Sequence, residues 1–82
     1  MSCRTVMAVA VSRRTKSAPK VQQVLTQHGC IINLRVGLHE TGKVCTEDGL
    51  IILSLCGTKR EVAALKADLA KLSGVKVKTL SV

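Results

Sequence analysis

The strongest constraint on the fold is the order in which two hydrophobic periodicities alternate along the chain. Apolar residues at three- and four-residue spacing predict helices in two segments, one before Gly29 and one before Gly74. Short runs that are β-branched or alternate between apolar and polar residues predict strands over residues 4–12, 31–40, 49–56 and 75–80. The predicted order of elements is therefore β-α-β-β-α-β.

The first predicted helix follows the polar segment RRTKS. Ser17 can cap its N-terminus, and Pro19 then falls in the first turn, where a missing N–H is tolerated. Gly29 is a typical helix stop. The residues that repeat at helical spacing are Val21, Val24, Leu25 and His28. Together these signals predict a helix between Ser17 and Gly29.

The second predicted helix has a stronger start signal. Thr58 and Glu61 form the T-x-x-E pattern of a capping box, in which each side chain accepts a hydrogen bond from the other residue's backbone. Gly74 is expected to end the helix. The apolar stripe that should be buried consists of Val62, Leu65, Leu69 and Leu72.

This order of elements is typical of α+β proteins with the ferredoxin-like (ACT-like) βαββαβ plan. We predict a four-stranded antiparallel sheet with two helices on one face, formed by a single domain over residues 1–82. Because the chain contains no Phe, Tyr or Trp, its core must be aliphatic. A domain of this size buries a modest share of its surface, so self-association is an expected source of stability.

The predicted sheet has a second face that the helices do not cover. In the first strand, the small side chains of Val6, Ala8 and Ala10 share one face. In the second strand, the two predicted faces are Ile32, Leu34, Val36 and Leu38 on one side and Asn33, Arg35, Gly37 and His39 on the other. The basic residues expected beside the small ones are Arg35, Lys76 and Lys78. We predict a homo-oligomer, either a dimer or a tetramer, with Val6, Ala8, Ala10 and Arg35 at its interface.

The chain is strongly basic, since 13 Lys and Arg residues against 5 Asp and Glu residues give a formal charge of +8. Such a surface attracts anions, including phosphorylated small molecules and nucleic acids. Arg13, Arg14 and Lys16 precede Ser17, where free N–H groups at a helix start favour an anion. These four residues are the candidate site for a small anionic ligand.

Nucleic-acid binding is the alternative function that the charge allows. Ferredoxin-like RNA-binding domains stack bases on aromatic side chains of the sheet, and this chain has none. Binding would rest on phosphate contacts and would be salt-sensitive and weakly specific. An enzyme is not expected, because no nucleophile motif, spaced carboxylate pair or phosphate-binding glycine loop is present.

The four cysteines, at positions 3, 30, 45 and 56, lack the CxxC spacing of zinc ribbons and thioredoxin-type sites. The segment LHETGKVC brings His39, Glu40 and Cys45 together, which makes His39 and Cys45 weak candidates for metal ligands. Adjacent strand residues point to opposite faces, however, and three local ligands rarely hold a metal alone. Neither a metal nor another cofactor is therefore expected.

The N-terminal apolar run VMAVAV is too short for an export signal, and no segment is long and apolar enough to span a membrane. We therefore expect a cytoplasmic protein whose thiols are free. A disulfide between Cys30 and Cys56, near the same end of the predicted hairpin, is the less favoured alternative.

Three segments, CIINLRVGLHE, GLIILSLCG and LAKLSGVKVKTLSV, closely resemble ACT-like proteins of the iron-only hydrogenase system regulator family. The resemblance extends from about Val21 to the C-terminus. It implies a ferredoxin-like ACT fold, an oligomer and a regulatory role exerted by binding a ligand or a protein. ACT domains commonly bind small ligands around the first loop at a subunit interface, which here is the loop of Arg13, Arg14 and Lys16.

The same fold resembles the metal-binding C-terminal domain of the nickel-responsive repressor. Arg35 and Gly37 occupy the positions of that domain's paired histidines, and Gly49 lies near its cysteine position. The resemblance therefore does not imply a nickel site in this chain.

Overall fold

The computed structural model describes residues 2–12, 14–39 and 49–82. These residues form strand β1 (Ser2–Val11), helix α1 (Arg14–Gln27), the 3-10 turn η1 (Gly29–Ile31), strands β2 (Ile32–His39) and β3 (Gly49–Gly57), helix α2 (Lys59–Ala70) and strand β4 (Val75–Ser81). The predicted βαββαβ order is confirmed. No helix of the described segments is long and apolar enough to cross a membrane.

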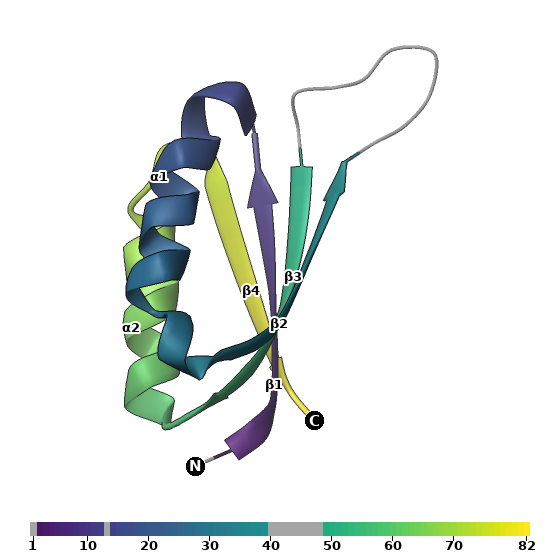
Figure 1. Ribbon diagram of the computed structural model, residues 1–82, viewed down its shortest axis with the longest axis vertical. Coiled ribbons are helices and arrows are strands. Elements are labelled where there is room, and N and C mark those ends of the chain that lie inside the picture. The colour runs from purple at the N-terminus through teal and green to yellow at the C-terminus, as the bar shows by residue number, and fades with distance from the viewer. Residues whose placement is uncertain (1, 13, 40–48) are drawn as a thin grey trace.

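The sheet has four strands in the order β2-β3-β1-β4 within the described residues, and each neighbouring pair is antiparallel. Figure 1 shows both helices on the same face of this sheet, with α2 running beside β4. The predicted two-layer α+β architecture, with one face of the sheet uncovered, is therefore confirmed.

The core lies between the helices and the covered face of the sheet. Alternate residues of the two central strands point into it, and Met7 and Leu53 are completely buried. The helices contribute Val21 and Leu25 from α1 and Leu65 and Leu69 from α2. The buried side chains of the described residues are thus aliphatic or methionine, as the absence of aromatic residues requires.

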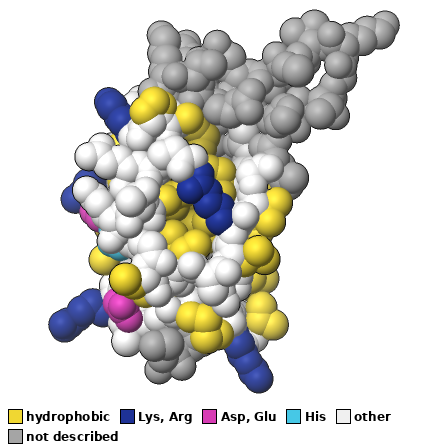
Figure 2. Space-filling view, viewed as in Figure 1, with side chains coloured by type: hydrophobic (Ala, Val, Ile, Leu, Met, Phe, Trp, Pro, Cys, Tyr) yellow, Lys and Arg dark blue, Asp and Glu magenta, His cyan; other side chains and the backbone are white. Residues whose placement is uncertain are grey.

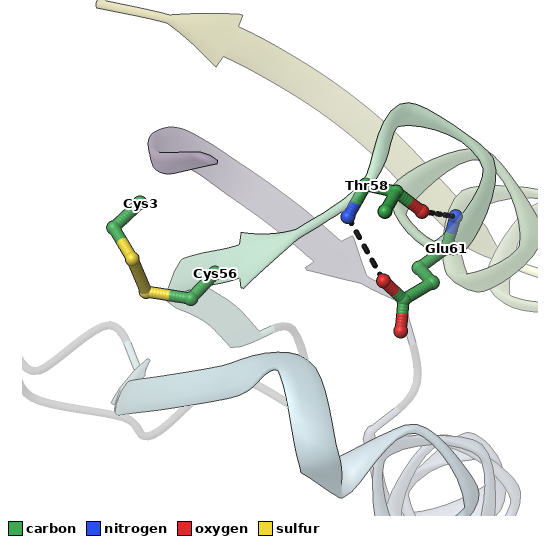
Figure 3. The surroundings of a disulfide bond; sticks show 4 residues. All are labelled: Cys3, Cys56, Thr58 and Glu61. Carbon is green, nitrogen blue, oxygen red and sulfur yellow. Dashed lines mark hydrogen bonds between the residues drawn. A yellow bond between two sulfur atoms is a disulfide. The ribbon is translucent and has the colours of Figure 1, made fainter. Parts of the chain in front are cut away.

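The start of α2 forms as the sequence predicts. The hydroxyl of Thr58 accepts a hydrogen bond from the backbone N–H of Glu61 at 3.1 Å, and the N–H of Thr58 donates to Glu61 Oε1 at 2.9 Å. This reciprocal pair is drawn in Figure 3. The preceding Gly57 has no room for a side chain, because an added Cβ would lie 2.9 Å from Ile31 Cγ2. A glycine at this point lets the end of β3 lie against η1.

The start of α1 differs from the prediction. The helix begins at Arg14, so Ser17 is in its first turn and is not the N-cap, and Pro19 lies inside the helix. The prediction was wrong because nothing in the Arg14–Lys16 segment opposes helical backbone, so the helix extends back almost to the end of β1. Pro19 has no N–H to donate to the carbonyl four residues earlier, and the helix continues past it.

Strand β2 contains a β-bulge that the alternation of its sequence does not reveal. Ile32 pairs with Leu55 and Leu34 pairs with Ser54, so the extra residue Asn33 has no counterpart in β3. The bulge puts Ile32 on the covered face but Leu34 and the residues that alternate with it on the uncovered face. The prediction that Ile32 shares a face with Leu34 was therefore wrong.

Candidate functional site

The uncovered face of the sheet is built from rows of side chains that run across the strands. The first row is Leu34, Ser54, Val6 and Leu80, the second is Val36, Ile52, Ala8 and Lys78, and part of a third is Leu50, Ala10 and Lys76. We call these residues the open face. Paired residues of an antiparallel sheet point to the same side, so the rows form one continuous surface.

The open face carries Leu34, Val36, Leu50 and Leu80, which among the described residues are the exposed large hydrophobic side chains other than Val82, the residue after β4. Their exposed fractions are 58% for Leu34, 41% for Val36, 38% for Leu50 and 63% for Leu80. Figure 2 shows hydrophobic side chains gathered along the margin of the molecule away from the helices. Contiguous exposed apolar surface of this kind typically marks an interaction site.

The second and third rows of the open face have their smallest side chains on β1. Ala8 lies between Ile52 and Lys78, and Ala10 lies between Leu50 and Lys76. The ammonium groups of Lys76 and Lys78 lie at the β4 edge, and they have no carboxylate partner among the described residues. The surface therefore has an apolar centre with short side chains and a basic edge.

Three of the four residues predicted at an oligomer interface lie together on this face, namely Val6, Ala8 and Ala10. Arg35 does not join them. It pairs with Leu53, which is buried on the covered face, so Arg35 lies on the opposite side of the sheet. The prediction that Arg35 shares a face with Val6, Ala8 and Ala10 was wrong, because the bulge at Asn33 exchanges the two faces of β2.

The predicted anion site is placed only in part. Arg13 lies outside the described residues, as do the side chains of Arg14, Lys16 and Ser17. The backbone of the last three forms the first turn of α1. The free N–H groups of a helix are the first four, so they belong to this turn and not to the residues after Ser17 as the sequence suggested.

The structure does not describe the side chains of the weak metal candidates, His39 and Cys45. Residues 40–48, which include Glu40 and Cys45, lie outside the described residues, and so does the side chain of His39. Among the residues that are described, no group of three or more His, Cys, Asp and Glu side chains could hold a metal ion.

The cysteines contradict the expectation of free thiols. Cys3 and Cys56 form a disulfide (Figure 3). Cys30 is free and exposed. The alternative pair Cys30–Cys56 is also wrong. β1 and β3 are antiparallel neighbours with Ser2 opposite Gly57, and this register puts Cys3 beside Cys56. Cys56 alternates with the buried Leu55 and Gly57, so the disulfide lies on the uncovered side of β3.

A hydrogen bond that the sequence did not reveal joins the two helical segments. His28 Nε2, just after α1, lies 2.7 Å from Asp68 Oδ2 on α2. This hydrogen bond lowers the pKa of Asp68 below its ordinary value, with a smaller contribution from Lys71, whose Nζ is 3.7 Å from Oδ1. The residues are 40 positions apart, and no local pattern connects them.

The sequence matches, over residues 4–79, a protein family described as "TM1266-like: Iron-only hydrogenase system regulator, putative". The match covers nearly all of the sheet and both helices. The chain belongs to the TM1266-like family. This family description names a regulator and no catalytic activity.

Solved structures agree with this assignment. The uncharacterized protein TM1266 from Thermotoga maritima is 28% identical, with a TM-score of 0.83 over 95% of this chain and 94% of that chain. A nitrogen regulatory PII-like protein, CPII from Thiomonas intermedia K12, has the same fold at 15% identity, with a TM-score of 0.53 over 95% and 92% of the two chains. That protein was solved bound to ADP, AMP and bicarbonate. No protein with a curated description matches this sequence significantly.

Proposed function

We propose that this chain is a small regulatory module that works as a homo-oligomer assembled through its open face. The observation that carries the proposal is that the exposed hydrophobic residues Leu34, Val36, Leu50 and Leu80 come from three strands and all lie on that face. Membership of a family described as regulators and the fold shared with a PII-like protein support the regulatory role.

A second copy of the chain is the occupant that best suits this face. In a two-fold interface the same patch meets itself, so an apolar centre is buried against an apolar centre. The short side chains of Ala8 and Ala10 allow the two sheets to approach, while Lys76 and Lys78 stay in solvent at the rim. The acidic residues of the described segments, Glu61 and Asp68, are both on α2, so this face has no carboxylate of its own to bury.

The regulatory input that we propose is a small anionic ligand. The net charge of +8 favours such a ligand. Arg13, Arg14, Lys16 and Ser17 at the start of α1 remain the site proposed from the sequence. A ligand at a subunit boundary would couple its own binding to assembly, since each stabilises the other.

The test of assembly is the molar mass in solution. Light scattering at about 50 μM, a concentration that populates weak interfaces, should give a dimer or a tetramer for the wild-type chain. Ala8→Arg puts a charge in the centre of the face and should produce monomers. The matched control Gln23→Arg adds the same charge on the exposed side of α1 and should leave the mass unchanged. A wild-type monomer at this concentration contradicts the proposal.

A further inference from the structure

A groove on the helix-covered side of the molecule has the size and chemistry of a ligand site. Its volume is about 570 Å³, and it lies between the N-terminal half of α2 and the ends of β1 and β4. Small-molecule sites typically occupy about 300–1,000 Å³. The groove is far from the start of α1, because it adjoins Thr5 and Ser81, whereas α1 begins just after the other end of β1.

Two lysines of α2 line this groove. Lys59 and Lys66 are seven residues apart, which corresponds to about two helical turns, so they project from the same side of the helix. Val62 lies between them and provides an apolar wall. Their spacing puts two cations along one edge of a concave surface.

Hydroxyl groups of the sheet face these lysines. Thr5 pairs with Ser81, and Thr79 pairs with the buried Met7, so all three hydroxyl residues are on the covered side of the sheet. The side chains of Thr79 and Ser81 are exposed within the groove. Hydroxyls can donate to an anion and accept from a sugar hydroxyl, whereas lysine can only donate.

The charge of the two lysines is not neutralised within the described part of the chain. Its two acidic residues are both engaged elsewhere on α2. Glu61 accepts from the backbone of Thr58, and Asp68 contacts His28 and Lys71. Neither Lys59 nor Lys66 has a carboxylate within 4.0 Å among these residues.

We propose that this groove binds a phosphorylated small molecule with an apolar or aromatic moiety, such as a nucleoside monophosphate. The phosphate lies between the ammonium groups of Lys59 and Lys66 and accepts from Thr79 and Ser81. The remaining volume is too large for phosphate alone, and its Val62 wall accepts the less polar part of the ligand. This groove is a site separate from the anion site proposed at the start of α1. Its binding does not depend on the proposed assembly, because the groove and the open face are on opposite sides of the sheet.

The experiment is calorimetric titration with AMP at fixed ionic strength, with adenosine and inorganic phosphate as partial probes. We expect saturable binding of AMP and weaker binding of both fragments. Lys59→Ala combined with Lys66→Ala should weaken AMP binding about tenfold or more, since it removes two charge-assisted contacts. Thr79→Val keeps the shape of the side chain and should weaken binding by a smaller factor. The matched control, Lys76→Ala with Lys78→Ala, removes the same charge from the open face and should bind AMP as the wild type does.

Three results overturn the inference. One is the absence of AMP binding to a folded wild-type chain. Another is an equal loss in the groove variant and the open-face variant, which would indicate attraction to net charge alone. The third is a loss on Arg14→Ala with Lys16→Ala and none on the groove variant, which would place the ligand at the start of α1. Light scattering on the same samples separates these outcomes from a failure of the proposed assembly.

Discussion

The two faces of the sheet use the same strands in opposite ways. On β3, Leu53 and Leu55 are completely buried beneath the helices, while Leu50 on the other face is exposed. On β1, Met7 and Val9 fill the core, while the small side chains of Ala8 and Ala10 lie on the open face. The covered face therefore stabilises the monomer, whereas the open face leaves large apolar side chains in solvent. Leucines of the same strand that lie on different faces should therefore respond differently to the same substitution.

Leu53→Ala and Leu50→Ala give the largest expected contrast. Leu53→Ala removes buried methyl groups and leaves a cavity, so it should lower the free energy of unfolding by about 2–5 kcal/mol. Leu50→Ala should lower it by less than about 1 kcal/mol in dilute monomer, since the side chain already contacts water. Urea unfolding at low protein concentration measures both values. Equal losses of unfolding free energy in the two variants would show that the covered and open faces do not differ in their contribution to stability.

The disulfide provides the next effect, on the uncovered side of the sheet. The bond between Cys3 and Cys56 links β1 to β3 across a sequence separation of 53 residues, on the face that no helix covers. Reduction, or Cys56→Ser, should lower the free energy of unfolding by about 2–4 kcal/mol. Thermal melts with and without dithiothreitol measure the change. Cys30→Ser should melt as the wild type does, because that thiol is free and exposed. An unchanged melt on reduction would contradict the pairing.

The capping box at the exposed start of α2 contributes a smaller effect. Thr58→Ala removes the acceptor of the Glu61 N–H and should lower the free energy of unfolding by about 1 kcal/mol. Thr26→Ala, an exposed position within α1, is the control for the substitution itself. Chemical denaturation of the two variants provides the comparison. A larger loss from Thr26→Ala would show that the box does not stabilise α2.

Lowering the pH should produce the smallest of these changes in stability. The pKa of Glu61 is lowered by its hydrogen bonds with the backbone and side chain of Thr58, and the pKa of Asp68 is lowered chiefly by His28. A carboxyl group with a lowered folded pKa stabilises the protein above its ordinary value, and this stability is lost as the pH falls through the lowered value. The melting temperature should thus decline below about pH 4.5, the ordinary value for Glu61. Asp68→Asn should reduce that decline, and an unaltered pH profile would argue against the His28 contact.

The sequence predicted those parts of the fold that depend on neighbours in the chain. Thr58 and Glu61 are three residues apart, so their capping box was readable, and the buried Leu65 and Leu69 followed from helical spacing. The face of Arg35 and the partner of Cys56 were not readable. Both depend on which residues pair between strands, and that register is settled by packing across the whole sheet.

The residues of the open face were predictable only where the pattern within one strand was enough. Val6, Ala8 and Ala10 share a face because strands alternate, and this needs no knowledge of the rest of the molecule. The exposed Leu34 and Val36 beside them were missed because one bulged residue reverses the alternation. The groove of Lys59 and Lys66 was missed because its hydroxyl wall comes from strands at both ends of the chain.

The bulge in β2 also has a consequence for aligning this sequence with its relatives. If Asn33 were deleted, Ile32 could still pair with Leu55 and Leu34 with Ser54, so every other side chain would keep its face. A one-residue alignment gap at Asn33 therefore leaves the strand pairing unchanged. The same gap at Arg35 would force Leu34 to change partner and move beneath the helices. The position of an alignment gap in β2 should therefore be chosen from the pairing of β2 with β3 and not from amino-acid similarity alone.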